Sequence, residues 1–469
     1  MEQTRGIRKY IGDRAFYRLA LGVMLPIILQ NLITSFVSLL DNIMVGQCGT
    51  AAMSGVAVVG QLMFNYMVII FGTVAGPGIF CAQYFGARDE GSLRAAFRCK
   101  LGMSLAVALV CMGVITLWGG ELAGLFLNGE EAARAEVMAY AMDYAKVIVW
   151  MMIPFAVASA YSSTLRETGQ TVVPMAASIA AVIINLFLNW VLIFGKLGAP
   201  ELGVVGAAWA TVASRVAEAA INVIYSHCRR DRLLFSKGFF GRLPVHPGLF
   251  GHILKRSMPL FFNEFLWSTG CSVVMQVYCS RGLVVVAALN IAYVISDLFQ
   301  MAAFSTGNTI GIIVGQQLGA GELDRAVDTD RKLIAFGLLV ALLLAGLMCL
   351  IAPLFPQLYN TTEEVRALAC RLVLVMAAVL PFGTLAHAGY FTLRSGGKTA
   401  ITFIFDSGFM WLVNIPAAWC ASHLTDWNIL LVYAASNSTD LLKAAIGLIL
   451  VRRKIWVNNL TEKGIKDAG

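Results

Sequence analysis

The sequence predicts an all-α integral membrane protein with twelve transmembrane helices in two six-helix lobes. Three observations lead to this prediction: an apolar composition, long apolar runs and an internal repeat. The 469 residues are 58% hydrophobic and only 13% charged, roughly half the ~25% charged share of a soluble domain. A soluble globule of this size cannot enclose so much apolar surface, because surface-to-volume scaling limits burial. A soluble enzyme, a nucleic-acid-binding protein and a disordered chain are therefore excluded as first interpretations.

Twelve segments are long and apolar enough to cross a bilayer, since a spanning helix needs ~20 mostly apolar residues. The predicted spans are 21–46, 54–81, 96–118, 138–162, 172–195, 203–226, 253–279, 284–313, 333–355, 368–391, 399–421 and 428–451. The longest hydrophilic stretch lies between the sixth and the seventh span, at the middle of the chain. It is predicted to link two halves of six spans each.

Lysine and arginine are concentrated in both terminal segments and in alternate loops, and the net charge is +8. The positive-inside rule places these segments on the cytoplasmic side, so both termini are predicted to be cytoplasmic. No cleavable signal is visible, and we expect a multi-pass protein of a prokaryotic cytoplasmic (plasma) membrane. The predicted domains are a tail (1–20), an N-lobe (21–226), a linker (227–252), a C-lobe (253–451) and a second tail (452–469).

The second half of the chain repeats features of the first half in the same order. They are Leu25-Pro26 and Met258-Pro259, Gly49 and Gly282, the Gln-x-x-Gly-Ala motifs at Gln83 and Gln316, and the Leu-Arg-x-x-Gly turns at Leu165 and Leu393. Because each half has an even number of spans, both halves enter the membrane in the same sense. This predicts a pseudo-two-fold axis along the membrane normal and a central cavity between the lobes. Such a layout favours a carrier that works by alternating access.

A group of polar residues interrupts the apolar runs of the first half. Asp41 lies late in the first span, where a carboxylate costs about 3 kcal/mol or more unless it has a partner, a cavity or a proton. Asn185 and Asn189 share one helix face, and their amides offer ligands to a cation and donors to a carboxylate. Thr211 follows on the small face of the next span. We predict these four residues as the cation-coupling group; the alternatives are a structural hydrogen bond for Asp41 and interhelical contacts for the asparagines.

Acidic residues also interrupt the apolar runs of the second half, at Glu264, Asp297 and Asp406. Phe261 and Trp267 lie close to Glu264 in sequence, and acidic groups beside aromatic rings suit a lipophilic cation. Glu264, Asp297, Phe261 and Trp267 are therefore predicted to bind substrate. The alternative for each acid is a pair with a lysine or arginine at a helix end.

Two pairs of opposite charge, Arg215 with Glu218 and Asp440 with Lys443, have i,i+3 spacing within single spans and are predicted to be structural. The segment 397–399 resembles the end of a P-loop but lacks the motif's first glycine, so we reject nucleotide binding. No metal-ligand spacing and no nucleophile–base pair stands out. We expect no cofactor and no metal beyond Na⁺ at the coupling site, so that an ion gradient must supply the work.

These residues together resemble the MATE (multidrug and toxic compound extrusion) family over nearly the whole chain. The resemblance rests on Leu25-Pro26, the segment 41–46, the Gln83 motif, both Leu-Arg-x-x-Gly turns, the segment 185–195 and the segment 206–211. It implies two six-helix lobes around a V-shaped cavity and export of organic cations in exchange for H⁺ or Na⁺. It further implies that Asp41, with Asn185, Asn189 and Thr211, couples transport to the cation.

The first functional hypothesis is therefore a secondary antiporter, not an enzyme, that expels lipophilic and often cationic compounds from the cell. Its partners would be the lipid bilayer, small organic substrates and a coupling cation, with no nucleic acid, and it is expected to act as a monomer. A flippase for a lipid-linked precursor is the alternative, but its cavity should present several cationic residues, and only Arg215 and Lys443 lie well within spans. A membrane enzyme or receptor is the third hypothesis.

Overall fold

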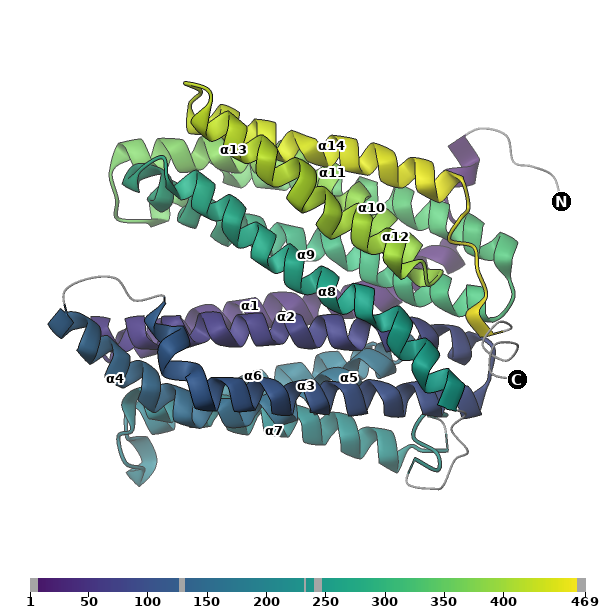
Figure 1. The fold of residues 1–469 in the computed structure, drawn as a ribbon, viewed down its shortest axis with the longest axis horizontal. Helices are drawn as coiled ribbons and strands as arrows, with labels where there is room; N and C mark the ends of the chain where they lie inside the picture. The colour runs from purple at the N-terminus through teal and green to yellow at the C-terminus, as the bar shows by residue number, and fades with distance from the viewer. Residues whose placement is uncertain (1–6, 126–130, 232, 240–246, 462–469) are drawn as a thin grey trace. The chain divides into compact units, whose positions relative to one another are not determined.

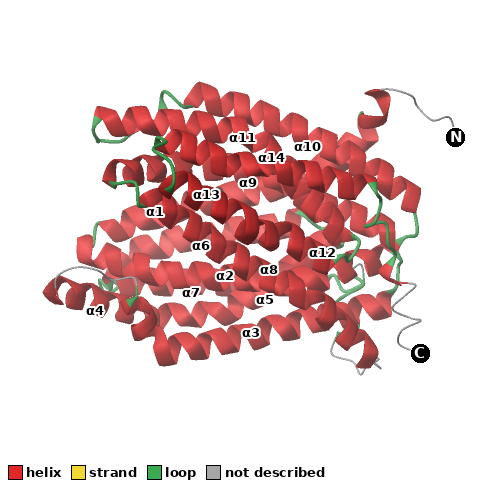
Figure 2. Ribbon diagram, turned by 45° about the horizontal axis from the view of Figure 1, so that its top comes forward, coloured by secondary structure: helices red, strands yellow, loops and turns green. Residues whose placement is uncertain are grey.

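The computed structural model describes residues 7–125, 131–231, 233–239 and 247–461. Throughout this part of the chain every regular element is a helix, as Figure 2 shows. The all-α prediction is therefore confirmed. The helices follow from the long apolar runs, because a backbone in lipid must satisfy its hydrogen bonds within its own segment.

The described residues of the first half form seven α-helices (Figure 1). They are α1 (Arg14–Gly46), α2 (Thr50–Gly86), α3 (Glu90–Gly124), α4 (Glu131–Ile148), α5 (Met152–Glu167), α6 (Val172–Ile193) and α7 (Gly203–Cys228). A short 3₁₀ stretch, Val149–Met151, joins α4 to α5, and together they make the fourth predicted span. Helix α1 begins at Arg14, before the predicted start at residue 21.

The second half contains the remaining α-helices (Figure 1). They are α8 (Pro247–Cys279), α9 (Leu283–Gly319), α10 (Leu323–Ile351), α11 (Glu363–Ser395), α12 (Thr399–Phe403), α13 (Ile415–His423) and α14 (Ile429–Arg452). Two π-helical stretches, Ile404–Gly408 and Met410–Asn414, connect α12 to α13. The four pieces form the eleventh predicted span.

Eleven helical segments of the described residues are long and apolar enough to cross a membrane. They account for every predicted span except 253–279, which lies in α8. Helix α8 spans 33 residues, but polar residues such as Asn263, Glu264 and Gln276 lower its hydropathy. The chain is thus a multi-pass membrane protein, and α8 is the span whose polar content needs an explanation.

The chain forms two compact units, which are not contiguous in sequence. One, here the N-terminal unit, comprises Leu29–Cys81 and Asp89–Leu254. The other, here the C-terminal unit, comprises Met1–Ile28, Ala82–Arg88 and Lys255–Gly469. Helices α1, α2 and α8 therefore each run from one unit into the other. The predicted domain boundaries, the pseudo-two-fold axis and the central cavity stay predictions.

Repeat-matched residues adopt matching geometry in the two halves. Gly49 and Gly282 precede the second helix of each half with φ of 108° and 119°, and Gly169 and Gly397 follow the Leu-Arg turns with φ of 82° and 71°. Side chains with a Cβ rarely adopt this region, so glycine allows both sharp turns. Pro26 and Pro259 likewise both lie inside helices.

Each unit has its own hydrophobic core. In the N-terminal unit, buried side chains from α1 to α7 form one cluster that includes Tyr66, Ile148 and Met152. The C-terminal unit has two clusters, one around Tyr278 and Tyr433 and one that includes Trp456. The polar residues described next are held within these packed helices.

Candidate functional site

Asp41 of α1 lies half-buried in the N-terminal unit, and its hydrogen-bond partners are neutral amides. Nδ2 of Asn189 donates to its Oδ1 at 2.6 Å. Asn185 and Asn189 both project from one face of α6, because residues four apart in a helix are neighbours. Both asparagines are buried. The structure therefore brings Asp41 and the two predicted asparagines together.

The amide of Asn185 lies against the carboxylate of Asp41. With its nitrogen toward Asp41, it donates to Oδ1 at 2.8 Å and to Oδ2 at 3.2 Å, which suits an ionised carboxylate. The same amide group lies 3.4 Å from Oγ1 of Thr211 and 3.2 Å from Nδ2 of Asn189.

Thr211 completes the predicted group from α7, where its hydroxyl donates to the carbonyl of Ala207. Tyr144 of α4 also contacts Thr211 and was not anticipated from sequence. Arg215 acts electrostatically on Asp41 but forms its ion pair with Glu218 at 2.7 Å. The i,i+3 prediction for Arg215 and Glu218 is thus confirmed, and Asp41 is not locked to an arginine.

A second polar group lies in the C-terminal unit around Glu264 of α8. The carboxylate is buried and accepts a hydrogen bond from the hydroxyl of Tyr390 at 2.9 Å. Nδ2 of Asn263 lies 3.3 Å from the same hydroxyl and donates to Oδ2 of Asp406 at 2.8 Å. Oδ1 of Asp406 in turn pairs with Nζ of Lys443 at 2.6 Å. A continuous polar chain thus connects α8, α11, the first π-helical stretch and α14.

The four residues predicted to bind substrate do not form one group. Phe261 and Trp267 lie one helical turn on either side of Glu264 and are half-buried, with the ring of Phe261 against Phe262. Asp297 of α9 is exposed, and the described residues offer it no hydrogen bond or ion pair. It is not part of the polar chain around Glu264.

The predicted pair of Asp440 with Lys443 is wrong. Lys443 forms its ion pair with Asp406, which comes from a different helix. Sequence spacing could find only the partner on the same helix. The partner from the first π-helical stretch is set by packing. Asp406 thus pairs with a basic residue, but Lys443 lies well inside α14 and not at a helix end, as the alternative for the acids had it.

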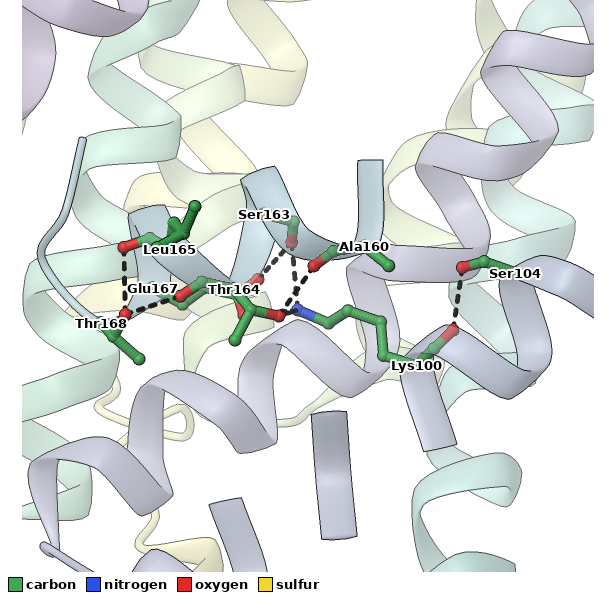
Figure 3. Close-up of polar contacts among 8 residues, drawn as sticks. All are labelled: Lys100, Ser104, Ala160, Ser163, Thr164, Leu165, Glu167 and Thr168. Atoms are coloured by element: carbon green, nitrogen blue, oxygen red, sulfur yellow. Dashed lines mark hydrogen bonds and ion pairs between the residues drawn. The ribbon is translucent and has the colours of Figure 1, made fainter. Parts of the chain in front are cut away.

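Sequence analysis also missed a buried ion pair in the N-terminal unit (Figure 3). Nζ of Lys100 contacts Oε2 of Glu167 at 2.5 Å and donates to the hydroxyls of Ser163 and Thr164 at 3.1 and 3.0 Å. The side chain of Lys100 is 0% exposed. The only signal in the sequence was a lysine near the predicted start of an apolar run. A lysine in that position is normally interpreted as a loop residue.

Among the described residues, no group of three or more His, Cys, Asp or Glu side chains could hold a metal ion. A monovalent cation can be held by fewer ligating side chains. Oδ1 of Asn189 is buried and accepts no hydrogen bond from the residues that the structure describes, so one amide oxygen beside Asp41 has a lone pair available. Together with the carboxylate, such an oxygen is a ligand that a hard cation prefers.

Comparison with known proteins gives matches over most of the chain. The MatE family model matches residues 26–191 and 259–420. The chain is 27% identical over 428 residues to the probable multidrug resistance protein YoeA of Bacillus subtilis, covering 89% of this chain and 90% of the relative. It is 24% identical to the probable multidrug resistance protein NorM of Thermotoga maritima, covering 95% and 94% of the two chains.

Solved structures show the same fold. A crystal structure of a mutant of the Vibrio cholerae MATE transporter VcmN superposes with a TM-score of 0.84 at 17% identity, covering 96% of this chain and 99% of that chain. At this level of identity the likeness concerns the fold alone. The family match, in contrast, spans both halves of the sequence.

Proposed function

We propose that this chain, which belongs to the MatE family of membrane transporters, is a secondary antiporter for multidrug efflux. It expels lipophilic, often cationic, organic compounds in exchange for H⁺ or Na⁺, by alternating access. The protein is a transporter and not an enzyme, in keeping with its family. Both relatives are named as probable multidrug resistance proteins, which supports the substrate class.

One observation carries the proposal: Asp41 is a membrane-embedded carboxylate whose hydrogen-bond partners are amides and not cations. A permanently charged group in this position is costly. Amide dipoles stabilise the anion without neutralising it, so a proton or Na⁺ can bind and leave. A structural ion pair, in contrast, would hold the carboxylate in one state.

The proposed coupling step begins with the ionised carboxylate, which accepts from both Asn185 and Asn189. Cation binding removes the charge, so that the amides of Asn185 and Asn189 no longer donate to an anion. Because Asp41 lies on α1 and its partners lie on α6 and α7, this exchange changes the contacts that hold α1. Antiport requires that ion and substrate favour different states, and that coupling free energy is reciprocal, typically 1–3 kcal/mol.

The test is dye efflux from proteoliposomes under separately imposed proton and sodium gradients. The variant Asp41→Asn should bind a cationic dye but lose gradient-driven exchange, because an amide cannot be neutralised by the coupling ion. The matched control is Asp143→Asn, which alters a 56% exposed carboxylate paired with Lys146. Gradient-driven exchange at the wild-type rate by Asp41→Asn would overturn the coupling role.

We further propose the membrane, the orientation, the oligomeric state and the substrate-binding residues of the transporter. The protein would act as a monomer in the cytoplasmic membrane with both termini in the cytoplasm, as the distribution of Lys and Arg favours. Glu264, with Phe261 and Trp267 one turn away on α8, would contribute to substrate binding. No cofactor beyond the coupling ion is proposed.

A further inference from the structure

Two polar contacts join α1 to α6 in the N-terminal unit. One is the contact of Asp41 with Asn185 and Asn189. The other lies about three turns away, where Nε2 of Gln30 donates to the hydroxyl of Ser178 at 2.7 Å. Positions separated by three whole turns lie on the same face of a helix. Gln30 and Asp41 therefore both face α6.

Helix α7 contributes one residue to each of these contacts. Thr211 lies at the first contact, with its Oγ1 3.4 Å from the amide of Asn185. Glu218 lies at the second contact, where its Oε1 accepts from the hydroxyl of Ser178 at 2.6 Å. Arg215 lies between Thr211 and Glu218, one turn or about 6 Å along the helix axis from Thr211. The guanidinium is thus held between the two contacts.

The guanidinium of Arg215 is bound to Glu218 and not to Asp41. Its Nη1 donates to Oε2 of Glu218 at 2.7 Å, and it lies over the ring of Phe155 of α5 at 5.5 Å. Its charge nevertheless acts on Asp41. The buried Nε of Arg215 has no hydrogen-bond partner among the described residues, so one donor of the guanidinium is unused. Asp41 and Glu218 therefore compete for one arginine, and Glu218 holds it.

Glu218 is itself fixed in the position that binds Arg215. It is buried, and the hydroxyl of Ser178 occupies its Oε1, which leaves Oε2 for the guanidinium. Ser178 accepts from Gln30, whose Oε1 accepts from Nη1 of Arg166 of α5 at 3.1 Å. Arg166 and Glu218 also attract each other electrostatically. Contacts from α1, α5 and α6 thus keep the carboxylate of Glu218 in place.

The other helices around Asp41 present neutral groups to it. Helix α6 presents the two asparagine amides, and α4 presents the phenol of Tyr144 beside Thr211. The position of the Arg215 guanidinium therefore determines how much positive charge the carboxylate meets. An arginine paired with Asp41 would neutralise it, and a proton or Na⁺ would have to displace that arginine in order to bind.

We propose that Glu218 is a positioning residue of the coupling site, which holds Arg215 away from Asp41 and so keeps the carboxylate available to the coupling cation. The pair of Arg215 with Glu218 then has a role beyond the structural one that its spacing predicts. This inference rests on the proposed function, in which Asp41 binds the coupling cation. It adds that a second acid, on α7, sets the cation affinity of Asp41.

The experiment measures the concentration of the driving cation, H⁺ or Na⁺, that gives half-maximal dye efflux from proteoliposomes. This concentration does not depend on the amount of active protein, so partial unfolding of a variant does not alter it. Glu218→Gln releases Arg215 to Asp41, and the half-maximal concentration should rise by on the order of tenfold through Coulomb attraction. The matched control is Asp143→Asn, which breaks an exposed i,i+3 pair with Lys146 and should leave the concentration unchanged.

A double variant separates positioning from stability. Arg215→Met/Glu218→Gln removes the guanidinium that acts on Asp41, so the half-maximal concentration should fall a few-fold below the wild-type value. A purely structural pair would alter the thermal unfolding midpoint and leave this concentration unchanged in both variants. The double variant therefore decides the question even where Glu218→Gln is too unstable to transport.

An unchanged concentration in Glu218→Gln would overturn the positioning role and leave the coupling role of Asp41 intact. The same conclusion follows if the double variant needs as much cation as the wild-type protein, or more. If neither gradient drives efflux by the wild-type protein, the proposed function fails, and this inference fails with it.

Discussion

Lys100 shows how a charge is accommodated inside the N-terminal unit. Its ammonium has three donors, and the structure supplies three acceptors, from Glu167, Ser163 and Thr164 (Figure 3). Oε1 of Glu167 also accepts from Ser163 at 2.6 Å. The ammonium of Lys100 is fully enclosed and has a partner for each of its donors, while the side chain of Glu167 is 13% exposed. We interpret it as a structural anchor between α3 and α5.

Removal of the charge on Lys100 should therefore destabilise the protein. Lys100→Met leaves the largely enclosed carboxylate of Glu167 without its cationic partner, and loss of one member of a buried ion pair typically costs about 3–5 kcal/mol. Thermal unfolding of the detergent-purified protein should show a clearly lower midpoint for this variant than for Lys146→Met, whose ion pair is 69% and 56% exposed. The double variant Lys100→Met/Glu167→Gln should recover much of the loss. Equal midpoints for the two single variants would contradict the anchor interpretation.

Three of the proline-containing helices have their proline at a similar position in the fold. Pro26 of α1, Pro77 of α2 and Pro259 of α8 each lie within a few residues of the point where the helix passes from one compact unit to the other. Proline removes a backbone hydrogen bond and clashes with the preceding turn, so it is a position where a helix bends. Pro381 of α11, in contrast, lies well inside the C-terminal unit.

A bend at Pro26 should matter for transport more than for folding. Pro26→Ala restores the missing donor and stiffens α1 between its two units. We expect dye binding to be retained while the rate of dye efflux from proteoliposomes falls several-fold. Pro381→Ala is the matched control and should transport at close to the wild-type rate. A similar loss of rate in both variants would show that the effect is not specific to the crossing point.

At the scale of the whole molecule, the C-terminal segment joins distant parts of the chain. Gln83, at the end of α2, is fully buried; it donates to the carbonyls of Ser395 and Asn458 and accepts from the backbone N–H of Leu460. Trp456 is 1% exposed within the C-terminal unit. The described part of the predicted tail 452–469 is thus packed, and it holds the end of α2 against the Leu-Arg turn of α11.

Loss of this packing should lower stability. Trp456→Ala removes a buried aromatic side chain, a change that typically costs 3–5 kcal/mol. The thermal unfolding midpoint in detergent should fall well below that of Trp427→Ala, whose ring is 45% exposed. If both variants unfold at the wild-type temperature, the C-terminal segment does not contribute to the folded unit.

The sequence by itself determined the class of the protein, the spans and the repeat. These depend on local properties: apolar runs long enough for a bilayer, and glycines such as Gly49 and Gly282 where the backbone takes a positive φ. It also indicated Asp41, Asn185, Asn189 and Thr211 as one group, because polar residues in apolar runs are few. The assignment of cation coupling to them stays a proposal.

Only the tertiary structure decided which distant charges meet. Lys443 pairs with Asp406 and not with its helical neighbour Asp440, and Lys100 pairs with Glu167 across two helices. Spacing along one helix reports neighbours on that helix alone. The partner from another helix depends on how the helices pack and on π-helical turns that redirect a side chain.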